Sequence, residues 1–183
     1  MPHLLDRLKQ DHKHLARLLD LLADLLDRFH DGSEPDYELM CEMLEYMECY
    51  ADQVHHPTEE LIFKRMLEYG NEKKRILDIL THQHAVLSQM NKRFRQSLEG
   101  IVHEEVLLRE DVEHQGRELV ETLWEHLNME EAEAFPYALE RLTDEDWEQV
   151  KEAAPKLNDP LFGDYDPARF RTLFAHLMEQ VQP

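Results

Sequence analysis

Four segments of this chain have the residue spacing of amphipathic helices, and each carries a histidine within its apolar face. Residues three and four positions apart share one face of a helix. On that face the segments place His12, His55, His84 and His126 among leucines, methionines and other apolar residues. A buried imidazole is costly unless a partner satisfies its polar atoms. Because one metal centre would satisfy all four, the pattern predicts a metal site inside a bundle of four helices.

Turn-forming residues divide the chain into these helices. Gly32 and Pro35 lie in the first turn, Gly70 in the second, and Gly100 begins the third connection. The predicted helices span roughly 3–29, 37–68, 72–99 and 108–140, followed by shorter ones at about 143–153 and 168–181. Since no segment alternates like a strand, the predicted class is all-α. We expect an up-down four-helix bundle over residues 1–142, with residues 143–183 packing on it as a helical C-terminal extension.

The distances from the turns predict that the four histidines lie level with one another. In an up-down bundle, residues equally far from a short turn lie at the same height. His12 and His55 are 18 and 19 residues from the two ends of the first turn, and His55 and His84 are 13 and 12 residues from the second. His126 is level with His84 if the aligned part of its helix begins near Asp111.

Two of the histidines have a glutamate one helical turn later. The pairs are His55 with Glu59 and His126 with Glu130. A spacing of four residues puts both side chains on one helix face, so each pair can reach the same cavity. Such pairs also arise by chance, and the apolar stripe is what selects these two.

A rival pair in the second helix is His56 with Glu60. Pro57 removes a helical hydrogen bond and can rotate the helix phase at this point, so the sequence leaves both pairs open. His14 and His82 are weaker rivals to His12 and His84, because both fall off their stripes.

The mixture of imidazoles and carboxylates indicates a transition metal. Calcium and magnesium sites are built almost wholly from oxygen, and six ligands are too many for one tetrahedral zinc. The set suits two iron or manganese ions bridged by the carboxylates, with a position left open for a small oxidant such as O2, NO or peroxide.

Composition excludes several classes of partner. The formal net charge of -20 argues against nucleic acid and against anionic membrane surfaces, both of which attract basic proteins. No uncharged apolar run is long enough to span a membrane, and the first residues lack the apolar core of a signal peptide. We therefore expect a cytoplasmic protein, with Cys41 and Cys49 as reduced thiols.

The motifs together resemble the hemerythrin-like family, the di-iron helical bundles known for an HHE signature. The matching segments are DH (11–12), HHPTEELIF (55–63), QHAVL (83–87) and HLNMEEAEAFP (126–136). The resemblance implies two carboxylate-bridged iron ions, other divalent metals being an alternative. The ligands that it implies are His12, His55, Glu59, His84, His126 and Glu130. Leu80 and Ser88 flank His84 where oxygen-carrying hemerythrins have a second histidine. This departure argues against reversible O2 transport.

Three classes of function fit these expectations. The first is a metal-binding protein that senses or reacts with O2, NO or peroxide, or handles iron. It would act as a monomer or homodimer, with an electron-transfer protein as a further partner. The alternative is a di-iron oxidase or peroxidase-like enzyme, although no histidine here has the Glu-x-x-His spacing of ferritin-type sites. A metal-free structural or partner-binding bundle is the third.

Overall fold

The structure is a computed structural model that describes residues 3–163 and 169–179, and its regular secondary structure in these ranges is helical. The elements are α1 (His3–His30), α2 (Tyr37–Tyr46), η1 (Met47–His55), α3 (His56–Glu68), α4 (Lys74–Val102), α5 (Arg109–Met129), η2 (Glu130–Ala134), α6 (Phe135–Arg141), α7 (Asp144–Ala153) and α8 (Arg171–Glu179). The two elements labelled η are π-helices, and each continues directly into its neighbours. The all-α class is confirmed.

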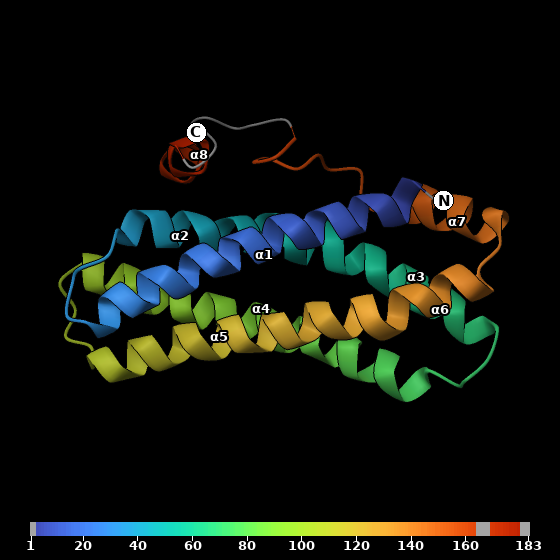
Figure 1. Cartoon of the computed structure of the whole chain (residues 1–183), viewed down its shortest axis with the longest axis horizontal. Helices are drawn as coiled ribbons and strands as arrows, with labels where there is room; N and C mark the ends of the chain where they lie inside the picture. The colour runs from blue at the N-terminus through green and yellow to red at the C-terminus, as the bar shows by residue number, and fades with distance from the viewer. Residues whose placement is uncertain (1–2, 164–168, 180–183) are drawn as a thin grey trace.

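The long helices lie lengthwise beside one another (Figure 1). α2, η1 and α3 follow one another along one line of the bundle, and α5, η2 and α6 along another. α1 packs on α5, α5 packs on α4, and α4 packs on α2. Within the described ranges, no helix is both long enough and apolar enough to cross a membrane.

The helix ends follow from local capping chemistry. The side chain of Asp36 accepts a hydrogen bond from the Leu39 amide and so begins α2. Thr143 and Asp146 form a reciprocal capping box at the start of α7. Gly32, at φ 88°, takes the left-handed conformation that ends α1. The third connection is shorter than predicted, because α4 continues as far as Val102.

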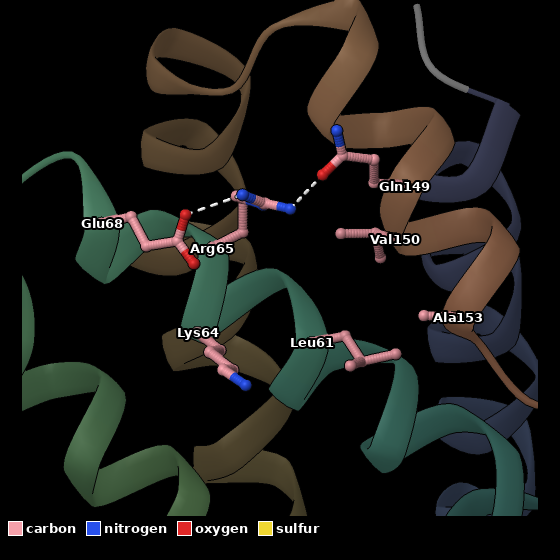
Figure 2. A pocket seen from close by; sticks show the side chains of 7 residues that line it. All are labelled: Leu61, Lys64, Arg65, Glu68, Gln149, Val150 and Ala153. Carbon is pink, nitrogen blue, oxygen red and sulfur yellow. Dashed lines mark hydrogen bonds and ion pairs between the residues drawn. The ribbon is translucent and has the colours of Figure 1, made fainter.

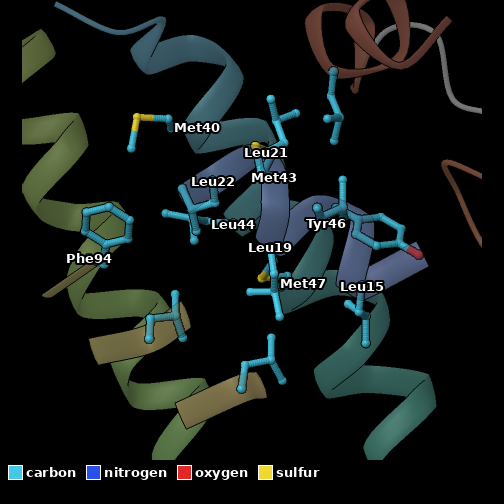
Figure 3. Packing of buried hydrophobic residues seen from close by; sticks show 14 of the residues in the cluster. Leu15, Leu19, Leu21, Leu22, Met40, Met43, Leu44, Tyr46, Met47 and Phe94 are labelled. Carbon is cyan, nitrogen blue, oxygen red and sulfur yellow. The ribbon is translucent and has the colours of Figure 1, made fainter. Parts of the chain in front are cut away.

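A layer of polar side chains separates two apolar clusters in the core. One cluster contains Leu15 to Phe29 of α1 with residues of α2, η1, the Phe94 end of α4, α5 and α8 (Figure 3). The other contains Leu4 to Leu8 of α1 with residues of α3, the Leu77 end of α4, α6 and α7. Along each line of the bundle, the buried residues on one side of the predicted metal ligand belong to one cluster, and those on the other side belong to the second cluster. The site is therefore built into the middle of the core.

The C-terminal helices pack on one side of this arrangement. α7 contacts α3, and α8 contacts α2. Between α3 and α7 lies a surface pocket, crossed by Arg65, which pairs with Glu68 at 2.7 Å and also bonds Gln149 (Figure 2). Residues 168, 180 and 181 of the predicted last helix lie outside the described residues. The domain division after residue 142 stays a prediction.

Gly116 provides a test of how tightly α5 packs. A Cβ atom at this position would lie 2.7 Å from side-chain atoms of Leu26 and Phe94, closer than real contacts allow. Overfilling a packed core costs about 1–3 kcal/mol. We expect Gly116→Val to lower the free energy of unfolding by about that amount in urea titrations. Glu118→Val puts the same side chain on an exposed position of the same helix, and an equal loss there would contradict the packing explanation.

Candidate metal centre

The structure brings the six predicted site residues together in one buried layer and adds a seventh, His56. None of the seven is more than 5% exposed. The layer contains His12 of α1, His55 of η1, His56 and Glu59 of α3, His84 of α4, His126 of α5 and Glu130 of η2. Every line of the bundle thus contributes at least one side chain.

The two glutamates lie between the histidines. Oε1 of Glu59 is 3.3 Å from Nε2 of His12 and 3.1 Å from Nε2 of His55, while its Oε2 is 3.5 Å from Nε2 of His84. The two oxygens of Glu59 therefore face different histidines, as a bridging carboxylate requires.

Glu130 faces the layer from the opposite line of the bundle. Its Oε2 is 3.3 Å from Nε2 of both His12 and His126, and its Oε1 is 3.6 Å from Nε2 of His84. Two donors that each lie about 2.1 Å from one ion, roughly at right angles, are about 3.0 Å apart. The observed nitrogen to oxygen distances are slightly longer, so the donors surround spaces of the size that a metal ion fills.

Local backbone geometry explains why both His55 and His56 reach the layer. In a regular α-helix the ring of Pro57 would collide with the carbonyl four residues earlier. The chain instead widens into the π-helix η1, in which the amide of His56 donates to the carbonyl of Ala51, five residues back. Thr58 Oγ1 satisfies the carbonyl of Val54 at 2.6 Å. The π-helix shifts the phase so that two adjacent histidines are buried together.

The second π-helix lies just before another proline. The amide of Phe135 donates to the carbonyl of Glu130, again five residues back, and Pro136 follows. The ring of Phe135 stacks on His12 at 5.0 Å between centroids. This π-helix begins at Glu130 and thus carries one of the two buried carboxylates.

Of the two rival pairs in the second helix, the structure places both histidines but only one glutamate in the layer. Both His55 and His56 are buried in the layer, whereas of the two glutamates only Glu59 is. Glu60 is 47% exposed and bonds Nδ1 of His84 from outside, at 3.0 Å. The stripe argument missed His56 as an additional member because it assumes α-helical periodicity, and Pro57 was the signal that the periodicity changes here.

The other rivals lie elsewhere. His14 stacks on Phe162 at 3.9 Å between ring centroids, and His82 is exposed on α4.

Each histidine of the layer is held through its outer nitrogen. Hydrogen bonds join Nδ1 to a neighbouring side chain in the pairs His12–Glu131 (3.0 Å), His55–Asp11 (3.1 Å), His84–Glu60 (3.0 Å) and His126–Gln83 (3.1 Å), and Nδ1 of His56 lies 3.4 Å from Asp52. An acceptor at Nδ1 fixes a proton there, so that in the neutral ring the lone pair of Nε2 is directed inward. Metal-binding histidines are oriented in this way.

Seven inner atoms of the layer have no hydrogen-bond partner among the described side chains, whereas Nε2 of His12 and Oε1 of Glu59 bond each other at 3.3 Å. The seven are Nε2 of His55, His56, His84 and His126, Oε2 of Glu59, and both carboxylate oxygens of Glu130. Buried polar atoms are nearly always satisfied, so this many converging orphan atoms need an explanation. The donors form two groups that could each hold an ion, His12, His55, Glu59 and Glu130 in one and His56, Glu59, His84 and His126 in the other. The residues fit a pair of ions that share Glu59.

The histidines of the layer offset the negative charge of its two glutamates. Burial alone lowers the pKa of His12 and His84, but their close contacts with the surrounding glutamates outweigh it and raise both pKa values to about 11. Burial likewise opposes ionisation of Glu59, and the surrounding histidines instead hold its pKa well below the usual value. Burial dominates for His126 and lowers its pKa to about 4. Two buried carboxylates thus attract positive charge to this layer.

The all-helical fold and the buried layer of imidazoles and carboxylates place this chain in a class, that of helical proteins with a candidate metal centre in the core. The model of the hemerythrin HHE cation binding domain matches residues 3–138, so the chain belongs to this family. The matched range includes the whole layer. Comparison with curated proteins and with solved structures gave no match.

Proposed function

We propose that this protein binds two iron ions in the buried layer of an up-down four-helix bundle and reacts there with O2, NO or peroxide. One observation carries the proposal. Unpartnered Nε2 atoms and carboxylate oxygens converge in the layer, and the outer Nδ1 atoms of the same histidines are already bonded to other side chains. Five imidazoles and two carboxylates are too many donors for one tetrahedral zinc and too rich in nitrogen for calcium or magnesium. Iron accepts this mixture of donors.

The two groups of donors suggest where a small molecule binds. The first group has two histidines, His12 and His55, and the second has three, His56, His84 and His126. Each group thus offers four protein donors, with Glu59 common to both. An ion with six coordination positions in either group would therefore keep positions open for a small molecule.

The surrounding side chains set the conditions of the reaction. Bound ferrous ions would supply electrons to the oxidant. The chain orients the ligands through Asp11 and Glu131, and the ring of Phe135 covers His12 on one side. Within the described ranges, no hydroxyl or ammonium group donates a hydrogen bond to the inner atoms. The chain thus offers no such donor to hold an oxidant unreacted in this layer, which supports reaction over reversible storage.

The chemistry of the chain also supports its proposed setting. A net charge of -20 favours small molecules and cations over nucleic acid or anionic membranes as partners. A cytoplasmic protein that exchanges electrons with a redox partner, as a monomer or homodimer, is the setting that we propose.

Iron analysis and rapid mixing with O2 test the proposal. Protein reconstituted with ferrous iron should hold about two ions per chain and be oxidised by O2 without returning to the ferrous form under vacuum. The diferrous protein should also bind NO. One tightly held zinc with no iron uptake would overturn the di-iron site, and a long-lived oxygenated form that releases O2 would show an oxygen carrier instead.

A further inference from the structure

Two buried tyrosines connect the candidate metal centre with the C-terminal segment. Tyr50 is 4% exposed and Tyr46 is fully buried, and their rings stack with centroids 5.7 Å apart. The hydroxyl of Tyr50 donates to the carboxylate of Asp11, with oxygen to oxygen distances of 3.2 and 3.3 Å. The same carboxylate accepts from Nδ1 of His55 at 3.1 Å. Asp11 thus joins the phenol of Tyr50 to a histidine of the metal layer.

The outer end of this connection approaches the surface. The hydroxyl of Tyr46 donates to Asp159 at 2.9 Å, and its ring meets Phe162 edge to face at 5.9 Å. His14, which is 21% exposed, stacks on Phe162 and lies 3.9 Å from the carboxylate of Asp159. Figure 3 shows Tyr46 among the apolar side chains of its cluster. A continuous series of contacts therefore runs from His55 to a partly exposed site.

Core packing alone does not explain two phenols here. Phenylalanine would fill the same space, and a buried hydroxyl has to be satisfied. Each hydroxyl is bonded to a carboxylate, an acceptor that can take a proton. Burial and the nearby carboxylates raise the pKa of both tyrosines, so the phenols keep their protons at neutral pH. Such a phenol loses an electron readily only if its proton moves at the same time, and a bonded carboxylate is positioned to receive it.

We propose that Tyr50 is a one-electron donor to the metal centre and that Tyr46 is the next member of the same relay. This inference rests on the proposed function, because it needs bound iron and peroxide as the oxidant. Peroxide takes up two electrons, and two protons from solvent, to form two water molecules. If the layer held one ferrous and one ferric ion, the bound metal would supply one of these electrons. Tyr50 supplies the other, its proton passes to Asp11, and a neutral phenoxyl radical remains.

The relay then moves the oxidation from Tyr50 to Tyr46, which contacts Asp159 and Phe162 beside the partly exposed His14. Tyr46 gives one electron to the Tyr50 radical, while its own proton moves to Asp159 and the proton on Asp11 returns to Tyr50. A thiol in solution gives up one electron to Tyr46 and its own proton to solvent, Asp159 returns its proton to Tyr46, and two of the resulting thiyl radicals combine as a disulfide. The protein thereby avoids uncontrolled oxidation of the buried ligands when peroxide meets a half-oxidised centre.

Freeze-quench EPR tests the relay in the iron-loaded protein. One equivalent of ferricyanide added to the diferrous protein prepares the half-oxidised centre, and peroxide is then mixed in. We expect a tyrosyl radical whose hyperfine splitting collapses when the protein is made with ring-deuterated tyrosine. The signal should be lost in Tyr50→Phe. In Tyr46→Phe the radical should persist longer and react more slowly with added thiol.

Tyr69→Phe is the matched control, because the Tyr69 hydroxyl also donates to a carboxylate, that of Asp146 at 2.5 Å, but lies outside the metal layer. It should leave the signal unchanged. Iron content is measured in every variant. Normal iron with an unchanged radical in Tyr50→Phe, or with no tyrosyl radical in the unaltered protein, would overturn the relay and leave the di-iron proposal standing. Absence of iron uptake in the unaltered protein would overturn both.

Discussion

Glu59→Ala should remove most of the bound iron, leaving less than about one ion per chain where the unaltered protein holds about two. The reason is that Glu59 is the one side chain common to both groups of donors, with its two oxygens facing different histidines. Its removal also leaves Glu130 as the one carboxylate of the layer that offsets the charge of bound cations. Iron per chain, measured after reconstitution and desalting, gives the result directly.

Glu60→Ala makes the same chemical change at the next residue. Glu60 bonds His84 from outside the layer, so its loss should weaken iron affinity by about 10–100-fold while saturating iron still fills the site. Circular dichroism should show that both variants remain helical. Equal iron content in Glu59→Ala and the unaltered protein would refute a bridging role for Glu59.

Removal of iron should lower the thermal midpoint by about 8–16 °C for each ion lost, relative to protein kept at a free iron concentration of about 1,000 times the dissociation constant. At that concentration, binding of one ion stabilises the folded state by about 4.1 kcal/mol, and a chain of this size gains about 2–4 °C per kcal/mol. The physical source is the set of inner donor atoms that lack partners within the described side chains. Anaerobic thermal scans of the ferrous and chelated protein measure the difference.

Glu59→Ala again supplies the control, since its thermal midpoint should respond little to added iron. An equal rise in that variant would place the stabilising ions elsewhere on this acidic surface. No rise in the unaltered protein would show that iron does not bind the native layer preferentially.

Helix positions could be predicted from the sequence because they depend on local signals. Apolar spacing and turn residues such as Gly32 and Gly70 placed the long helices within a few residues of their bounds. The six stripe residues of the layer could be predicted for the same reason, as the helical period sorts inward from outward positions. The short terminal helix α7 was also predicted, from its Thr143 cap.

The rest of the layer depends on features that a fixed period cannot represent. His56 enters because the backbone widens before Pro57. The acceptors of the outer nitrogens come from other helices in several cases, as Glu131 does for His12 and Gln83 for His126. Asp11 lies beside His12 in sequence but serves His55. These hydrogen bonds depend on how two helices are rotated relative to each other. The spacing of residues along one helix gives no information about that rotation.

The dispersal of the ligands along the chain has a consequence for how the protein is made. The first candidate ligand is His12 and the last is Glu130, so the complete set spans most of the chain. A ribosome releases the N-terminal helices first, and the final histidine and carboxylate emerge only with α5 and η2. A nascent chain cannot complete the layer before then. Filling of the candidate metal centre would therefore be a late event in biosynthesis, and a filled centre would mark a chain whose helical domain has been synthesised and assembled.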